Sequence, residues 1–172
     1  MARHVGLAAA LASALALGAC GKPNNPGVGS EQPIMGSEQP SSAPAALTSA
    51  QKQALLAQLP SPYRSADLSN GQAKIAICLS CHTLTQGGAD MTGPNLWGVF
   101  GRKAGSEPGF AYSDAMKGAG WIWDADRLNT WIADPRAVLP GTKMTFVGLA
   151  DPTDRRDVIA YLKIATSPPP RT

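Results

Sequence analysis

The residues with the clearest chemistry are two cysteines and a histidine in the run Cys78-Leu79-Ser80-Cys81-His82. Residues three and four positions apart lie on one side of a helical turn, so both thiols and the imidazole can reach the same group. A Cys-x-x-Cys-His run is the attachment signature of c-type haem. In that chemistry the two thiols form thioethers with the porphyrin and the histidine binds the iron. One such run predicts one covalently bound haem.

Two other chemistries use closely spaced cysteines. A thioredoxin-like thiol-disulfide site needs a βαβ surround, and a zinc ribbon needs a second pair of cysteines. No alternating strand pattern of useful length follows Cys81, and the remaining cysteine, Cys20, stands alone. We therefore favour haem over both alternatives.

The sixth ligand of the iron separates electron transfer from small-molecule chemistry, because a strong ligand leaves no open coordination site. The neutral candidates are methionines: Met35, Met91, Met116 and Met144. Spacing favours Met144, which lies in a loop far from His82 along the chain, although a single methionine more often fills a core. Without this ligand, the open site would suit a haem peroxidase or a gas sensor.

Helices must position these residues. Capping signals, apolar periodicity and proline stops predict four of them. They run from Thr48 to Pro60, from Asp67 or Ser69 to Ser80, from Asp124 to Pro135, and from Asp151 or Thr153 to Pro168. The chain also has 18 glycines and 15 prolines, which indicate long loops over 83–113 and 135–150. So small a core with so much loop suggests that a cofactor fills its centre.

The first part of the chain has the composition of a targeting segment. Arg3 and the apolar run Val5–Leu17 are typical of a signal peptide and too short for a transmembrane helix. We predict a lipoprotein-type signal peptide over 1–19, because Leu17-Gly18-Ala19-Cys20 resembles the bacterial lipoprotein box with lipidation at Cys20. A simply cleaved signal peptide is the alternative.

The remaining chain divides by composition. Residues 20–47 are rich in Pro, Gly and Ser with few large apolar side chains, which predicts a disordered tether. We expect a short N-terminal extension over 48–66, the haem domain over 67–166 and a disordered tail over 167–172. A net charge of +3, with 16% charged residues, is too weak a basic bias to indicate a nucleic-acid partner.

Several further motifs support a family resemblance. They are Gly93-Pro94-Asn95-Leu96, Gly98 to Lys103, Pro108 to Asp114, Pro140 to Met144 and Asp157 to Lys163. Together they resemble the mitochondrial-type class I cytochromes c and their bacterial relatives over about residues 67–165. The resemblance implies an all-α class I cytochrome c fold, with four to five helices and long loops around one covalent haem c. It also implies a monomeric electron carrier that is not an enzyme.

The same resemblance implies roles for individual residues. Met144 would be the second axial ligand, with Phe146 over the exposed haem edge and Thr142 near a propionate. The Pro94 carbonyl would accept a hydrogen bond from His82. The inner propionate would be held by Arg102, Tyr112 and Trp123.

Two more expectations concern departures from the family pattern near the haem and a contact between two helices. Trp131 stands where the family has a buried tyrosine near the methionine sulfur, and Met116 stands where it has an asparagine. Gly71 and Tyr161 would meet where the first and last helices of the domain cross.

For partners, the resemblance implies a quinol-oxidising cytochrome bc complex as donor and a terminal oxidase as acceptor. The location implied is the periplasmic side of a bacterial cell envelope, with a lipid anchor at Cys20. Mitochondrial members present a ring of surface lysines to acidic partners, and this chain has fewer basic residues at those positions. Arg136 and Lys143 remain, whereas Ala150 and Asp151 occupy neighbouring positions. A dedicated redox subunit of one dehydrogenase is the alternative.

Overall fold

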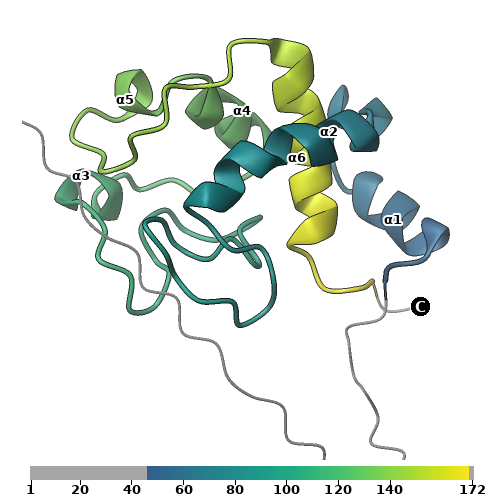
Figure 1. Cartoon of the computed structure of the whole chain (residues 1–172), viewed down its shortest axis with the longest axis horizontal. Coiled ribbons are helices and arrows are strands. Elements are labelled where there is room, and N and C mark those ends of the chain that lie inside the picture. The colour runs from purple at the N-terminus through teal and green to yellow at the C-terminus, as the bar shows by residue number, and fades with distance from the viewer. Residues whose placement is uncertain (1–45, 171–172) are drawn as a thin grey trace, which may run out of the picture. The chain divides into compact units, whose positions relative to one another are not determined.

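The computed structural model describes residues 46–170, and every regular element in that range is helical (Figure 1). The elements are α1 (Ser49–Leu56), the 3-10 helix η1 (Tyr63–Ser65), α2 (Leu68–Lys74), the 3-10 helix η2 (Ile75–Ser80), α3 (Asp114–Lys117), α4 (Ala125–Ala133), α5 (Pro135–Val138) and α6 (Pro152–Ala165). Within this part of the chain the one strand-like feature is an antiparallel bridge between Lys103 and Ile122. The predicted all-α class is confirmed.

The four predicted helices begin at side chains that cap them. In each case a side-chain oxygen of the N-cap accepts a hydrogen bond from a backbone N–H of the first turn, which has no partner within the helix. The N-caps of α1, α2, α4 and α6 are Thr48, Asp67, Asp124 and Asp151. Three of the four are aspartates, whose charge also suits the positive end of the helix dipole.

Three details differ from the prediction. The segment predicted as one helix to Ser80 is α-helical only to Lys74 and continues as the 3-10 helix η2. The short helices α3 and α5 were not predicted, because four residues are too few to show a helical period. They are fixed by their caps, Ser113 and Asp134, which accept hydrogen bonds from the backbone of Met116 and Ala137.

The most extensive helix contact joins α2 and α6, which cross as Figure 1 shows. Gly71 lies at this crossing. A Cβ atom there would lie 2.2 Å from the Asp157 carbonyl oxygen and 2.9 Å from the Tyr161 Cβ. The predicted meeting of Gly71 with Tyr161 is confirmed, and the missing side chain sets how closely the helices approach.

A buried carboxylate locks the same crossing. Asp157 accepts hydrogen bonds from the Asp67 backbone N–H at 3.0 Å and from Asn70 Nδ2 at 2.8 Å, and it pairs with Arg156 at 2.7 Å. Burial alone would raise the pKa of Asp157, but the hydrogen bonds from Asn70, Arg156 and the Asp67 backbone hold it below its usual value. The carboxylate therefore stays ionised and paired inside the protein.

The N-terminal extension joins the main core. Leu55, Leu59 and Tyr63 are buried, and both α1 and η1 contact α6. The Tyr63 hydroxyl donates a 2.9 Å hydrogen bond to Asp126 of α4. Residues 48–66 thus pack as part of the helical unit.

No helix within residues 46–170 is long and apolar enough to cross a membrane. The predicted signal peptide, Cys20 and almost all of the predicted tether lie outside the described residues. The haem domain is predicted to end at residue 166 and the tail to begin at residue 167. Thr166 and Ser167, the residues on the two sides of that boundary, are both buried.

Candidate functional site

The candidate site is a cavity of about 300 Å³ enclosed by η2, α3, α4, α6 and the loops between them. Every predicted site residue among the described residues lies on its wall. They are Cys78, Cys81, His82, Pro94, Arg102, Tyr112, Trp123, Trp131, Thr142, Met144 and Phe146. The structure thus brings together residues that are separated by up to 68 positions in the sequence.

The two cysteines lie where η2 ends. The Cys78 carbonyl accepts hydrogen bonds from the backbone N–H groups of Cys81, at 3.1 Å, and His82, at 3.0 Å, which closes the turn. Both thiols are free and half-buried. Burial, and then the neighbouring Cys81, raise the pKa of the Cys78 thiol. In the described part of the chain, no three His, Cys, Asp or Glu side chains are grouped to hold a metal ion.

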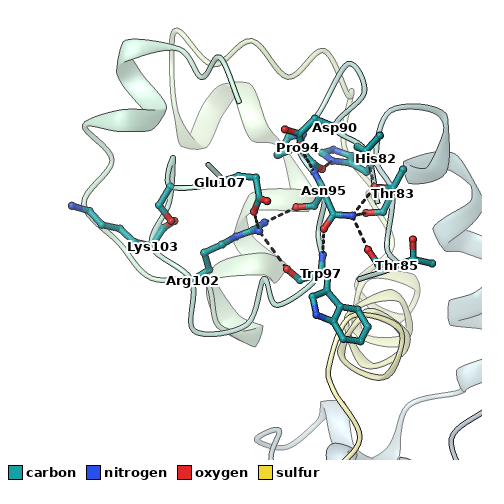
Figure 2. Close-up of polar contacts among 12 residues, drawn as sticks. His82, Thr83, Thr85, Asp90, Pro94, Asn95, Trp97, Arg102, Lys103 and Glu107 are labelled. Atoms are coloured by element: carbon teal, nitrogen blue, oxygen red, sulfur yellow. Dashed lines mark hydrogen bonds and ion pairs between the residues drawn. The ribbon is translucent and has the colours of Figure 1, made fainter. Parts of the chain in front are cut away.

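The His82 ring is oriented by a backbone carbonyl. Its Nδ1 lies 2.7 Å from the Pro94 oxygen, as predicted (Figure 2). A carbonyl can only accept, so Nδ1 carries the proton and Nε2 keeps its lone pair for a metal. Burial lowers the pKa of His82; the hydrogen bond to Pro94 opposes this shift, and Arg102 adds to it. The imidazole is therefore neutral, the form that binds iron.

Gly93 gives this ring its space and was not predicted to do so. A Cβ atom at Gly93 would lie 2.3 Å from His82 Cε1. The Gly93 N–H also donates to the Cys81 carbonyl at 2.8 Å, which ties the following loop to the turn that carries Cys81 and His82. Gly93 is the first residue of the motif Gly93-Pro94-Asn95-Leu96, which the sequence analysis used for the family resemblance. The position of a glycine in a motif does not by itself show what its missing side chain leaves room for.

Asn95 holds that loop together and was also missed (Figure 2). Its Nδ2 donates to Thr83 Oγ1 at 2.6 Å and to the Thr85 carbonyl at 3.0 Å, and its Oδ1 accepts from the Trp97 N–H at 2.9 Å. The side chain is buried. An asparagine next to proline in a loop is a general turn signal, and it does not reveal which segments the side chain will link.

Arg102 is held by a third residue that the sequence analysis missed, Glu107. The guanidinium forms an ion pair with the Glu107 carboxylate and donates to the Asn95 carbonyl at 2.8 Å (Figure 2). Burial lowers the pKa of Arg102, although a guanidinium remains charged in proteins. The positive charge on the cavity wall is therefore fixed and partly compensated.

Two further donors line the cavity with Arg102. Burial raises the pKa of Tyr112, so its hydroxyl keeps its proton. Trp123 is buried, and its ring lies edge-on to Trp121 and Trp131, with centroids 5.8 and 5.5 Å away. A guanidinium, a phenol and an indole that line the same cavity suit an anionic group such as a carboxylate.

The structure narrows the choice of methionine. Met144 and Met116 line the cavity, whereas Met91 does not, and Met35 lies outside the described residues. Met144 is held in its loop by its own N–H, which donates to Thr142 Oγ1 at 3.2 Å. Lys143 Nζ donates to the Ala111 carbonyl at 2.9 Å and so connects this loop to the chain before α3.

These residues fit a covalently bound haem: two free thiols and a neutral imidazole lie on one turn, methionines line the same cavity, and hydrogen-bond donors are available for a carboxylate. The model of the family described as cytochrome c matches residues 68–165. The chain belongs to the cytochrome c family.

Individual cytochromes support this assignment. The chain is 47% identical over 102 residues to cytochrome c2 of Rhodomicrobium vannielii, covering 59% of this chain and 82% of that protein. It is 49% identical over 90 residues to cytochrome c of Theileria annulata, covering 52% and 77%. The solved structure of cytochrome cH from Methylobacterium extorquens aligns with a TM-score of 0.53 and 44% identity, over 57% of this chain and 98% of that one.

Membership of the cytochrome c family establishes the cofactor and the kind of activity. The protein carries one covalent haem c and acts with redox partners as an electron carrier, not as an enzyme. The extension that contains α1 and η1 lies before the matched range, so its packing on α6 is an addition to the region that the family model describes.

Proposed function

We propose that His82 and Met144 are the two axial ligands of the haem iron, and that the protein shuttles single electrons in a respiratory or related chain. The observation that carries this proposal is that both side chains line the same cavity as the two thiols. When bound, the haem iron supplies the one-electron couple. The protein's part is to hold the iron in one coordination geometry in both oxidation states.

The cavity residues support this role through fixed contacts. The Pro94 carbonyl, 2.7 Å from His82 Nδ1, makes the imidazole a better ligand and fixes its orientation. A thioether ligand stabilises ferrous relative to ferric iron and so raises the reduction potential. Trp131 and Trp123 line the same cavity and help exclude water from it.

Met144 suits the ligand role better than Met116. Met116 belongs to α3 and is buried in the main hydrophobic core, where its side chain is needed for packing. Met144 lies in a loop that Lys143 fastens to Ala111, so its sulfur can be positioned without disturbing a helix. This difference makes Met116 a matched control on the same cavity wall.

The wider setting is proposed by resemblance. The electron donor would be a quinol-oxidising cytochrome bc complex and the acceptor a terminal oxidase. The carrier would act as a monomer on the periplasmic side of a bacterial cell envelope, anchored by a lipid at Cys20.

The test replaces each methionine in turn. Met144→Ala should lower the reduction potential by more than about 60 mV, a tenfold change in a one-electron equilibrium, and should let carbon monoxide bind ferrous iron. Met116→Ala should change the potential less and stay closed to carbon monoxide. Lys143→Ala should be combined with Met144→Ala, because the neighbouring amine could otherwise replace the lost sulfur.

Potentiometry and carbon monoxide titration decide the outcome. A parent protein that already binds carbon monoxide rapidly would have an open sixth site, which favours a peroxidase or gas sensor. A Met144→Ala protein with unchanged potential would exclude this methionine as the ligand.

A further inference from the structure

A second cavity, also of about 300 Å³, lies where the N-terminal extension meets the haem domain. Gln58, Leu59 and Pro60 of the extension line it, together with residues from the chain before Arg102, the start of α4 and the last turn of α6. Those three residues precede residue 68, where the match to the cytochrome c family begins. The extension therefore builds one wall of a site that the family region alone does not form.

Large apolar side chains form much of the wall of this cavity. They belong to Leu59, Phe100, Ile122 and Trp123. Leu59 and Trp123 are buried, whereas Ile122 is 58% exposed. Ligand sites are typically apolar cavities in which a small number of polar groups fix the ligand. An occupant of this cavity would take the exposed Ile122 side chain out of water.

Lys163 of α6 brings a positive charge to the same wall. Its ammonium lies 5.0 Å from the centroid of the Phe100 ring, a contact that supplies attraction but no opposite charge. Within residues 46–170 four ion pairs form, and none of them includes Lys163. Burial lowers the pKa of Lys163. Taking an ammonium partly out of water without a partner is costly, and an anion in the cavity would reduce that cost.

Asp124 supplies the carboxylate among the lining residues, and the fold already uses it. As the N-cap of α4, its Oδ1 accepts a 2.7 Å hydrogen bond from the Arg127 N–H. The positive end of the helix dipole offsets its negative charge. The two charges on the wall therefore differ, because Asp124 is occupied by α4 and Lys163 is available to a ligand.

We propose that this cavity binds a small carboxylate with an apolar body. The carboxylate pairs with the Lys163 ammonium, and the body lies against Phe100 and Ile122. A volume of about 300 Å³ is at the lower limit of ligand pockets, so the occupant is a small molecule. The proposal goes beyond electron shuttling and does not depend on which side chain is the sixth ligand of the iron.

The second cavity shares a wall with the haem cavity. Trp123 lines both, and its backbone N–H donates to the carbonyl of Arg102, another residue of the haem cavity, at 2.9 Å. A bound anion would lie behind this wall, where its charge favours ferric over ferrous iron. By thermodynamic linkage, the ferric protein should bind the ligand more tightly, and the ligand should lower the reduction potential.

The test uses 3-phenylpropanoate as the probe and the haem-loaded protein, with binding measured by NMR titration. The ferric parent should bind the probe with a Kd of about 5 mM or lower. 3-Phenylpropanamide has the same body without the charge, and it should bind about tenfold or more weakly. The ferrous parent should bind the carboxylate about twofold or more weakly than the ferric parent.

Variants locate the charge that binds the probe. Lys163→Gln should weaken binding of 3-phenylpropanoate about tenfold or more, whereas Lys163→Arg keeps the charge and should stay within about threefold of the parent. Lys52→Gln is the matched control, because it removes the same charge from an exposed position of α1 that does not line the cavity. It should bind the probe as the parent does. Nuclear Overhauser effects should join the probe to the Ile122 methyl groups.

Three results would overturn the proposed site: no binding by the parent, equal weakening in Lys163→Gln and Lys52→Gln, or equal affinity for the carboxylate and the amide. Equal affinity of the ferric and ferrous parent would overturn its link to the haem. The absorbance spectrum reports axial ligation during each titration. It should stay unchanged, and a change would place the probe on the iron and contradict the site. A failure of Met144 ligation is thus distinguishable from a failure of binding at Lys163.

Discussion

Replacement of Asn95 by alanine should destabilise the loop that carries the His82 hydrogen-bond acceptor. The substitution removes two donated hydrogen bonds, to Thr83 Oγ1 and the Thr85 carbonyl, each worth about 1 kcal/mol. It also leaves the Trp97 N–H without its acceptor, which costs about 1–3 kcal/mol if that group stays buried. We expect the free energy of unfolding to fall by about 3 kcal/mol or more.

The assay is guanidinium unfolding of the haem-loaded protein, followed by far-ultraviolet circular dichroism. Asn129→Ala is the matched control, because the Asn129 side chain accepts one 2.9 Å hydrogen bond, from Arg155 Nε. Because the donor is a charged guanidinium, this loss should cost about 1.5–3 kcal/mol, at or below the loss expected at Asn95. The low-spin spectrum of the Asn95→Ala protein should persist without denaturant, since the thioethers still hold the haem beside His82.

A double-mutant cycle sharpens the test. Thr83→Val removes the hydroxyl that accepts from Asn95, so the two changes should be coupled by about 0.5–3 kcal/mol. Strict additivity, or an Asn95→Ala protein no less stable than the Asn129→Ala protein, would refute the role given to this network.

Two further predictions concern the helices. Gly71→Ala should lower the free energy of unfolding by about 1–3 kcal/mol or more, because the new Cβ would lie 2.2 Å from the Asp157 carbonyl oxygen. Gln72→Ala, at an exposed position of the same helix, is the control. Equal losses of stability in the two variants would contradict the close packing of α2 against α6. Tyr63→Phe should cost about 1.5–3 kcal/mol at neutral pH through loss of the bond to Asp126. Burial and the bond to Asp126 raise the pKa of Tyr63 from 10.0 to about 12. The parent protein should therefore lose the stability contributed by this hydrogen bond as pH rises from 10.0 to about 12, whereas the Tyr63→Phe protein should not. Parallel pH profiles of the two proteins in thermal melts would contradict this prediction.

Sequence was sufficient where chemistry or capping is local. The run from Cys78 to His82 identifies its cofactor because the spacing on one turn is the chemistry itself. Aspartates and a threonine before apolar periods located the starts of the main helices, since capping depends on residues only two or three apart. The family resemblance added the placement of Pro94 and Arg102, which local patterns do not give.

Sequence was insufficient where a side chain links distant segments. Glu107 reads as an ordinary loop residue until the fold places it against Arg102. Asn95 donates to the Thr85 carbonyl and the Thr83 hydroxyl, 10 and 12 positions away, and no periodicity reveals such contacts. Gly93 is needed because the His82 ring occupies the space of its side chain, which only the folded loop reveals.

The fold separates two kinds of stabilising contact. At the crossing of α2 and α6, Gly71 and the buried Asp157 network involve protein atoms alone, so substitutions there should act on unfolding with little effect on the iron. Around the cavity, the loops are joined by hydrogen bonds such as Lys143 Nζ to the Ala111 carbonyl and Asn95 Nδ2 to Thr83 Oγ1. The same loops supply residues that line the cavity, among them Pro94 and Met144, so the loops and the haem stabilise each other. A change to a residue that lines the cavity, such as Met144, should therefore alter ligation and stability together, whereas Asn95→Ala, at a residue that does not line it, should lower stability alone. Comparing the reduction potential with the free energy of unfolding for each variant distinguishes the two classes.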